Sequence, residues 1–419
     1  MPLHRVGPFT LDTRTLLLFR EDEIVKVPMK TVEVLLALLE RRGQIATKDE
    51  LLKAAWPDSI VEEANLTVHV ALLRKTLGEA APIETIPKRG YRLLIETATS
   101  AGTTEAERNA REAILRGRYF WNKFTRTSLE RATSAFSEAL TAMPDSGEAA
   151  SGMCDTLLMQ GLFGFNQNRA VFSEARLLGE AAARTAVNSP EAHASLAFSA
   201  LFDRFDFTIA EQALNRALNL APGRVEPHLW SGLFHALRGD TLRALAAARE
   251  ASAIDPISLK AVVGSGFHLY LTQQYQPDLA PLVKALELEP EFAVAHWALG
   301  LACDRLGDFT RAQEAHRSAV LHSGRSPTME SNLARSLALS GKKKEAHAIA
   351  GRLVSEGLAP YRQATIEVAL GENESAIASI ERAFSVRDPW LVVLKVDPML
   401  DPIRSNRRIQ AIEKEVLRS

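Results

Sequence analysis

Cysteine is nearly absent from this chain of 419 residues, since only Cys154 and Cys303 occur. Two cysteines so far apart form neither the closely spaced pairs of a zinc site nor the framework of a disulfide-stabilised secreted domain. We therefore expect no metal site. Free cysteines also favour a reducing compartment such as the cytoplasm.

Long apolar runs are absent as well. No stretch approaches the roughly 18 uninterrupted apolar residues of a membrane-spanning helix. The first residues, MPLHRVGPFTLD, lack the apolar core of a secretory signal peptide. We therefore expect a soluble, cytoplasmic protein. The chain is too long for one hydrophobic core, which favours roughly two to four domains.

A strong net charge is the third missing feature. The formal net charge is −1, and residues 1–98 hold 14 Lys and Arg against 14 Asp and Glu. The charge is nevertheless uneven, because between residues 64 and 92 five cations face only Glu79 and Glu84. A local basic face on a neutral domain is compatible with DNA contact.

Motifs of the common enzyme classes are also missing. Gly264-Ser265-Gly266 has Leu269 where a dinucleotide fingerprint needs glycine. Gly341-Lys342 has Ser336 where a phosphate-binding loop needs its first glycine. The sequence has no zinc-protease motif and no nucleophile elbow. Several histidines are scattered at positions typical of packing or surface residues: His228, His235, His296 and His316. We expect no catalysis, no metal and no cofactor.

The most informative segment is 64–93, where a helix and a two-stranded hairpin are expected. Leu66, Val70, Leu73 and Leu77 recur at helical spacing and form one buried stripe. Gly78 stands where a glycine often ends a helix. Two short strands then flank Pro87-Lys88-Arg89-Gly90, a basic hairpin tip. Together these elements predict a winged helix-turn-helix.

The preceding residues predict a compact α+β domain. Three short strands are expected at 6–11, 15–19 and 24–27, with a turn at Asp12-Thr13. A helix follows over 30–42, closed by Gly43. Thr47 and Glu50 then form a capping box for a helix over 49–56, which Pro57 terminates.

This order resembles the OmpR/PhoB-type winged-helix domain, closest to its CadC-like branch without a receiver domain. The match covers about 5–96 and includes Lys48-Asp-Glu-Leu-Leu52, Leu73-Arg-Lys75 and Ile83–Arg92. The resemblance implies that 64–77 enters the major groove of promoter DNA, that the 85–92 wing touches adjacent DNA, and that loop 57–62 contacts RNA polymerase. The implied DNA-binding residues are Asn65, Thr67, Val68, His69, Ala71, Leu72, Arg74, Lys75, Thr85, Lys88, Arg89 and Arg92.

One departure from the family concerns base recognition. The face opposite the buried stripe carries Ala64, Val68, Ala71 and Leu72, whereas many relatives place arginines near 71 and 72. Apolar side chains contact thymine methyl groups but cannot make the bidentate guanine contact. We therefore expect modest sequence specificity, with a log–log salt slope of roughly −3.5 if about four cations contact phosphate. His69 is expected to contact the flanking DNA backbone or solvent, and Trp56 to lie in the core. The alternative is a winged helix that binds only protein.

Beyond a short polar linker, a period of 34 residues replaces the strand pattern. Ala217, Ala251, Ala285 and Ala319 follow this spacing, and a second alanine series and the glycines at 239, 307 and 341 fit the same period. Such a period is the signature of tetratricopeptide (TPR) repeats, each a pair of antiparallel helices. We expect a winged-helix domain at 1–97, a linker at 98–106 and an all-α TPR superhelix at 107–419. An insertion is expected around 161–168, and a cap at 397–406 before a last helix.

The resemblance to TPR arrays implies a protein or peptide partner on the concave face. By repeat register this face includes Phe202, Leu229, Leu233, Phe267, Tyr270, Trp297, Leu301 and Arg305. The alternative is that most of these side chains pack against neighbouring repeats. The combined prediction is a DNA-binding transcriptional regulator whose TPR array controls promoter binding through a partner, self-association or a homodimer. The competing prediction is a TPR scaffold whose winged helix does not bind DNA.

Overall fold

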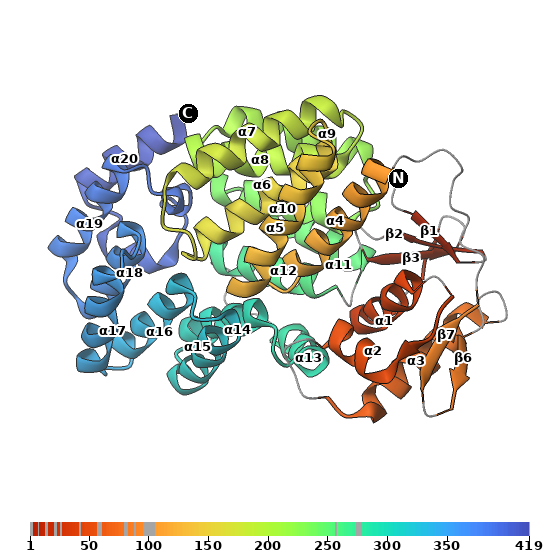
Figure 1. The fold of residues 1–419 in the computed structure, drawn as a ribbon. Coiled ribbons are helices and arrows are strands. Elements are labelled where there is room, and N and C mark those ends of the chain that lie inside the picture. Colours follow the sequence, from red (N-terminus) through yellow and green to blue (C-terminus); the bar gives the residue numbers. More distant parts are fainter. Residues whose placement is uncertain are drawn as a thin grey trace. The chain divides into compact units, whose positions relative to one another are not determined.

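The computed structural model describes residues 3–6, 8–12, 16–20, 23–25, 27–41, 43–56, 61–78, 83–87, 89–94, 105–255, 258–273 and 279–418. The chain forms two compact units, Met1–Arg111 and Glu112–Ser419 (Figure 1). In the described part of the chain, no helix combines the length and the apolar character needed to cross a membrane.

The first unit opens with an antiparallel sheet of four strands: β1 (Leu3–Val6), β2 (Phe9–Asp12), β3 (Leu17–Arg20) and β4 (Glu23–Val25). The prediction of three strands was wrong. The expected first strand at 6–11 is divided at Pro8, which lies in a turn between β1 and β2. Proline lacks the N–H that a continuous strand would donate, so Gly7-Pro8 is a turn signal inside an otherwise apolar run.

Three helices pack into a single core with a second, smaller sheet. They are α1 (Met29–Glu40), α2 (Lys48–Ala55) and α3 (Glu63–Leu77). The predicted capping box is confirmed, because the Thr47 side chain accepts from Glu50 N and the Glu50 side chain accepts from Thr47 N. The predicted stripe Leu66, Val70, Leu73 and Leu77 is confirmed as the buried face of α3.

The hairpin is part of a three-stranded sheet. Strands β6 (Ile83–Ile86) and β7 (Gly90–Leu93) are antiparallel, and β5 (Ala46–Thr47) pairs with the other edge of β7. The two-residue strand β5 was not predicted, since Ala46 and Thr47 are too short a run to show a period. This domain is a winged helix-turn-helix, as predicted.

The second unit is an all-helical superhelix of paired antiparallel helices, and its first helix begins before the unit boundary, at Glu105. The pairs are α4 (Glu105–Trp121) with α5 (Arg126–Ala142), α6 (Gly147–Leu162) with α7 (Ala170–Thr185), α8 (Pro190–Arg204) with α9 (Phe207–Leu220), α10 (Val225–Arg238) with α11 (Thr241–Ile254), α12 (Leu259–Leu271) with α13 (Ala280–Leu288), α14 (Ala293–Leu306) with α15 (Phe309–Ser323), α16 (Pro327–Leu339) with α17 (Lys343–Ser355), and α18 (Pro360–Leu370) with α19 (Asn373–Ser385). Two 3-10 helices, η2 (Pro389–Val393) and η3 (Pro398–Ile403), and α20 (Arg407–Arg418) follow.

The 34-residue period has a direct structural cause. Alanines of the repeat lie where paired helices touch, and Ala217, Ala251 and Ala319 are 0% exposed. The turn between the helices of a pair also repeats, because φ is positive at Gly239, Gly307 and Gly341. The same turn position holds Phe205 and Gln273, which adopt φ of 60° and 57° although they are not glycine. The repeat geometry therefore overrides the residue preference there.

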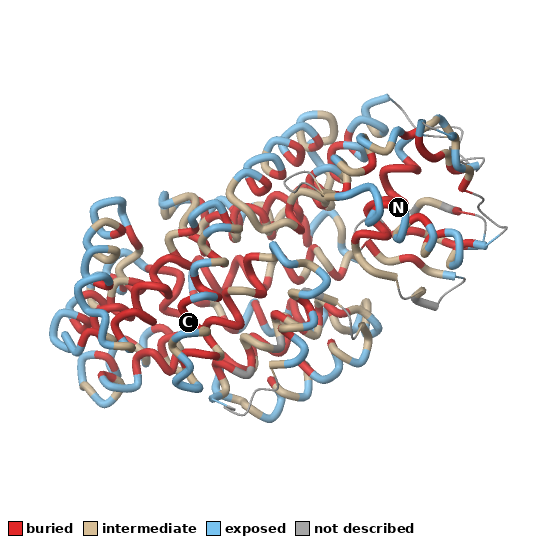
Figure 2. Tube along the Cα trace, turned by 90° about the horizontal axis from the view of Figure 1, so that it is seen from below, coloured by how far each residue is buried: buried red, intermediate tan, exposed pale blue. Residues whose placement is uncertain are grey.

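The superhelix is so strongly curved that its early repeats contact its late repeats. The loop after α6 contacts the start of α16, where Ser326 Oγ donates to Phe163 O at 2.7 Å and Thr328 Oγ1 donates to Leu162 O at 2.7 Å. We call this contact between residues 161–169 and 324–328 the closure seam. The loop between α6 and α7 lies where an insertion was expected, around residues 161–168. Buried residues run through the middle of the helical unit (Figure 2).

The residues after α19, 387–404, fill the inner side of the superhelix; we call them the C-terminal segment. The ring centroids of Trp390 and of Phe202 on α8 lie 6.5 Å apart. Lys395 Nζ donates to Arg238 O at the end of α10. Asp397 accepts hydrogen bonds from Tyr270 Oη on α12 and Tyr361 Oη on α18, each at 2.9 Å. The C-terminal segment, which includes residues 397–404 of the predicted cap, therefore joins distant repeats.

Acidification is expected to destabilise the repeat domain through His268. This side chain is 2% exposed, and its ring packs so tightly on Gly232 that an added Cβ there would lie 2.5 Å from the ring. Burial lowers the pKa of His268 to about 4. Because the unfolded pKa is near 6.5, the stabilisation is complete above that value and is lost as pH falls toward 4. Between pH 7.5 and 5 the loss is about 2 kcal/mol.

Urea unfolding of the full chain at the two pH values measures this loss. His268→Leu should reduce the difference by most of that amount, whereas His347→Gln, at an exposed position on α17, should leave it unchanged. An undiminished pH dependence in His268→Leu would assign the acid sensitivity to other groups.

Candidate DNA-binding interface

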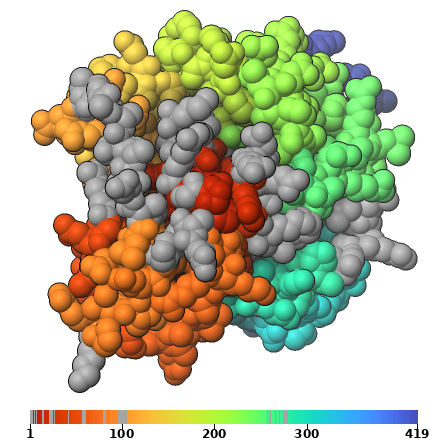
Figure 3. Space-filling view, turned by 90° about the vertical axis from the view of Figure 1, so that its right-hand side faces the viewer, coloured from red at the N-terminus to blue at the C-terminus, as the bar shows by residue number. Residues whose placement is uncertain are grey.

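The outer face of α3 is exposed and mostly apolar. Val68, at its centre, is 63% exposed, and the side chains of this part of the chain reach the surface shown in Figure 3 (orange). Ala64 and Ala71 are exposed and Leu72 is half-buried. Asn65 and Thr67 are exposed polar residues, but Thr67 Oγ1 donates within the helix to Glu63 O at 3.0 Å. Few groups on this face are suited to hydrogen bonding with base edges.

His69 faces the interior edge of the same helix. Its Nδ1 lies 2.8 Å from Thr31 Oγ1, and its ring centroid lies 5.2 Å from that of Trp56. Burial, followed by the charge of Lys30, lowers the pKa of His69. The structure thus places the imidazole between α1, the end of α2 and α3, where its contacts hold the recognition helix in place.

Arg74 connects the recognition helix to the hairpin. Its Nε and Nη2 donate to Ile83 O at 2.9 and 2.7 Å, and Nη2 also donates to Thr85 Oγ1 at 2.6 Å. The guanidinium also lies 5.9 Å from the centroid of the Tyr91 ring. Since several donors are directed into the domain, Arg74 fixes the angle between α3 and β6. Only its remaining donors are available to a ligand.

The other cations fall into two groups. Arg92 Nη2 pairs with the Glu84 carboxylate across the hairpin at 2.6 Å. Lys75 and Arg89 are exposed and make no ion pair or hydrogen bond of their side chains within the described residues. Lys88 lies outside the described residues, as do residues 57–60 of the expected polymerase-contacting loop. Lys75 and Arg89 are therefore the described cations with the most capacity for phosphate.

The residues predicted for the inner face of the repeat domain lie mainly in its interior. Six are between 1% and 7% exposed: Phe202, Leu229, Leu233, Tyr270, Trp297 and Leu301. Phe267 and Arg305 are half-buried. The aromatic rings pack on one another, with Phe267 5.2 Å from Trp297 between ring centroids. The arrangement favours the packing alternative, in which these side chains contact other repeats and the C-terminal segment.

Sequence reasoning did not identify the residues that hold the C-terminal segment. Asp388 Oδ2 accepts from Tyr361 N at 2.9 Å, and Asp397 Oδ2 accepts from Tyr361 Oη at 2.9 Å. The remaining oxygens cap the 3-10 helices by accepting from Trp390 N and Met399 N. The available signal was the repeated Asp-Pro dipeptide, with an N-cap aspartate before a proline at the first helical position.

Comparison with known proteins supports the identity of the N-terminal domain. Residues 22–93 match the family described as "Transcriptional regulatory protein, C terminal". Transcriptional regulator HilA of Salmonella typhimurium is 40% identical over 78 residues, covering 18% of this chain and 14% of HilA. Transcriptional activator CadC of Escherichia coli K12 is 29% identical over 99 residues, covering 22% of this chain and 19% of CadC. The chain thus matches less than a fifth of the length of either regulator.

A repeat protein is among the solved structures that align with this chain. A tetratricopeptide repeat protein from Parabacteroides merdae aligns with 74% of this chain and 99% of its own, with 15% identity and a TM-score of 0.38. The TPR-like assignment of the second unit rests on its paired helices and its 34-residue period. A winged-helix domain of the transcriptional-regulator type is therefore followed by TPR-like helical repeats.

Proposed function

We propose that this protein is a transcriptional regulator that binds promoter DNA through α3 and the β6–β7 hairpin. The observation that carries this proposal is the combination of an exposed α3 face with two exposed cations, Lys75 in the last turn of α3 and Arg89 at the hairpin tip, on a domain of the transcriptional-regulator type. HilA and CadC, which are transcriptional regulators by name, support the same assignment.

The side-chain contacts support different roles for different residues of this interface. Lys75, Lys88 and Arg89 neutralise phosphates, while Val68, Ala71 and Leu72 contact the groove. Arg74 and Arg92 primarily position the hairpin, since their side chains already bind Ile83 O and Glu84. Asn65, Thr67, Thr85 and His69 complete the proposed set. Affinity would come mainly from phosphate contacts and depend steeply on salt.

The repeat domain is proposed to control DNA binding through a protein or peptide partner or through self-association as a homodimer. Two linked winged helices on adjacent sites would bind far more tightly than one, because the second binding step becomes intramolecular. Contact of the 57–62 loop with RNA polymerase belongs to the same proposal.

Replacing Lys75 and Arg89 together with alanine is expected to lower the slope of log Kd against log salt by about 2 in magnitude, because two phosphate contacts are lost. The measurement is a salt titration of full-length protein on random-sequence duplex DNA by fluorescence anisotropy. The matched control is Arg317→Ala/Lys344→Ala, two exposed cations of the repeat domain, which should keep the slope.

Three results of this experiment distinguish the proposed functions. A reduced slope in the Lys75/Arg89 variant alone supports the interface. If both variants keep the slope of the unaltered chain, the DNA contacts lie elsewhere. No binding of the unaltered chain even at low salt would favour the competing function, a TPR scaffold whose winged helix contacts protein through the apolar face around Val68. Selection from a random DNA pool then gives the preferred site and the half-site spacing.

A further inference from the structure

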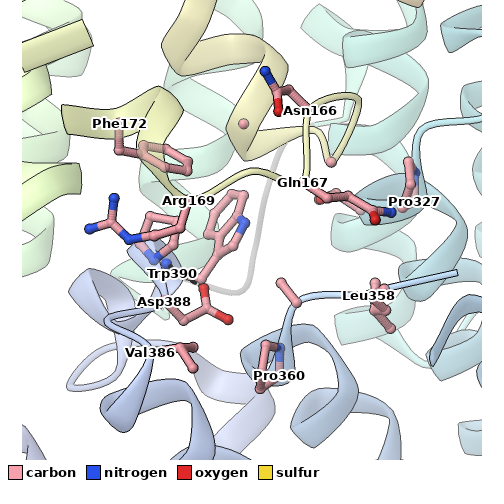
Figure 4. A pocket seen from close by; sticks show the side chains of 16 residues that line it. Asn166, Gln167, Arg169, Phe172, Pro327, Leu358, Pro360, Val386, Asp388 and Trp390 are labelled. Atoms are coloured by element: carbon pink, nitrogen blue, oxygen red, sulfur yellow. Dashed lines mark hydrogen bonds between the residues drawn. The ribbon is translucent and has the colours of Figure 1, made fainter. Parts of the chain in front are cut away.

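A cavity of about 210 Å³ lies beside the closure seam, within the repeat domain (Figure 4). Its walls come from four separate segments: 161–172 around the α6–α7 loop, the start of α16, the α17–α18 turn at 357–360, and residues 386–390. The cavity therefore touches both sides of the closure seam and the beginning of the C-terminal segment.

The size of the cavity restricts its ligand. An engineered apolar cavity of about 150 Å³ binds benzene, whereas sites for drug-sized ligands span about 300–1,000 Å³. A volume near 210 Å³ therefore suits one ring with a small substituent, on the order of ten non-hydrogen atoms.

The lining is mainly apolar, and two of its polar groups are well placed for a ligand; the polar lining residues are Asn166, Gln167, Arg169, Thr328 and Asp388. Phe172, Leu358, Pro360 and Trp390 supply apolar surface, and the Asp388 carboxylate and the Gln167 carboxamide lie among them (Figure 4). A site of mainly apolar walls with a few polar groups is typical of small-molecule recognition. It favours a planar apolar ring over a sugar, whose many hydroxyls would lack partners.

Asp388 has unused capacity to accept hydrogen bonds. The residue is 2% exposed, and its two oxygens accept from Tyr361 N and Trp390 N at 2.9 and 3.0 Å. Each carboxylate oxygen has a second lone pair. The Gln167 side chain makes no hydrogen bond within the described part of the chain, so its amide is free to donate and accept.

The charges around Asp388 favour a neutral ligand over a cationic one. Burial raises the pKa of Asp388, and the nearby Arg362 and Arg169 oppose that shift. Arg362 lies 3.5 Å from the centroid of the Trp390 ring, and Arg169 Nε donates to Arg387 O. With two guanidinium groups already near the carboxylate, an N–H or O–H donor completes its hydrogen bonding without adding a third cation.

We propose that this cavity is an effector site for a neutral single-ring ligand carrying an amide or hydroxyl donor. The ring lies against Trp390, the donor binds Asp388, and Gln167 binds the acceptor of the same substituent. Because the ligand contacts both sides of the closure seam, it binds the closed superhelix in preference to an opened one. Its effect on promoter binding rests on the proposed function, whereas its binding to the cavity does not.

The test uses the full chain and benzamide as the probe, with benzoate and glucose as matched comparisons. Isothermal titration should detect benzamide at micromolar to millimolar Kd. Benzoate has the same shape but no N–H donor, and should bind at least tenfold more weakly because Asp388 would receive no hydrogen bond from it. Glucose should give no heat of binding. Benzoate binding as tightly as benzamide would overturn the assigned role of Asp388.

Two variants examine the cavity itself. Gln167→Trp, in an exposed loop, places a large ring at the cavity and should weaken benzamide binding at least tenfold. Asp388→Asn retains the shape and should reduce the preference for benzamide over benzoate. Leu321→Ala, at a 72% exposed position on α15, is the control and should bind normally. Unchanged affinity in Gln167→Trp would overturn the site, and this variant suffices if Asp388→Asn does not fold.

A separate measurement distinguishes the site from the proposed function. The Kd for duplex DNA is measured at fixed salt with and without saturating benzamide, and a change of at least threefold that Gln167→Trp abolishes supports effector control. Benzamide binding by a protein that binds no DNA would retain the cavity site and reject the proposed regulator. DNA binding without any binding of benzamide, or of phenol as a hydroxyl-bearing ring, would reject the effector site alone.

Discussion

Replacing Asp397 with alanine is expected to lower the free energy of unfolding of the repeat domain by about 3–5 kcal/mol, the usual cost of breaking a buried charged network. Asp397 is 3% exposed and accepts from Tyr270 Oη, Tyr361 Oη and Met399 N. Its removal would leave both tyrosine hydroxyls buried without an acceptor.

The loss should extend beyond the immediate contacts, because Asp397 joins distant parts of the array. Tyr270 is 127 positions away from Asp397 in the sequence, and Tyr361 is 36 positions away. Hydrogen exchange of the full chain is the appropriate measurement. Peptides from α12 and α18 should exchange faster in Asp397→Ala, together with those of the C-terminal segment.

Asp401→Ala is the matched control, since Asp401 also precedes a proline and is separated from Asp397 by only three residues. Asp401 is exposed and binds Arg404 at 2.9 Å on the surface. Exposed ion pairs contribute about 0–1 kcal/mol, so this variant should be nearly as stable as the unaltered chain. Equal stability of the two variants would show that the buried network around Asp397 does not hold the superhelix closed.

Local pattern was sufficient to predict most elements of the fold. The stripe Leu66–Leu77 and the capping box at Thr47 involve residues three or four positions apart, so their spacing alone identifies helices. The helical pairs were predictable for the same reason, because each repeat packs mainly on its neighbours. The errors arose where a turn interrupts an apolar run, as at Pro8 between β1 and β2.

Long-range pairing was not predictable in the same way. Arg74 lies on the exposed edge of its helix by spacing, and only the folded hairpin brings Ile83 O and Thr85 within reach of its guanidinium. Similarly, repeat register identified Tyr270 and Trp297 as inner-face residues, but register does not indicate what covers that face. The C-terminal segment does so, through contacts between residues more than a hundred positions apart.

The two domains therefore differ in how their candidate sites arise. In the winged helix, the exposed face is formed by one helix and one hairpin, and the helical spacing of the sequence predicts its position. In the repeat domain, the inner surface is occupied by the chain itself, and a cavity lies at the closure seam. A regulator of this design would respond to ligands at the closure seam more readily than to a peptide in the occupied inner groove.

The second large effect is expected in the winged helix, where Gly90→Ala should destabilise the domain by at least roughly 3 kcal/mol, beyond the usual range of point mutations. Gly90 has φ of +148° and pairs with Thr47 in the β5–β7 ladder. A Cβ at this position would lie 2.0 Å from Ala46 O and 2.8 Å from Thr47 Cα. Both are backbone atoms, so no side-chain rotation relieves the clash and β5 must separate from β7.

Gly43→Ala separates this steric effect from the cost of positive φ. Gly43 has φ of +80°, but its added Cβ would meet only Leu93 O, at 3.8 Å. Its substitution should cost on the order of 1–2 kcal/mol, the ordinary cost of a left-handed residue. Hydrogen exchange of the full chain, read on peptides from β5 and β7, measures both variants. If Gly90→Ala exchanges no faster there than Gly43→Ala, the β5–β7 pairing tolerates a side chain at the base of the wing. If it exchanges much faster, weaker DNA binding should accompany the change, because the hairpin carrying Arg89 depends on that pairing.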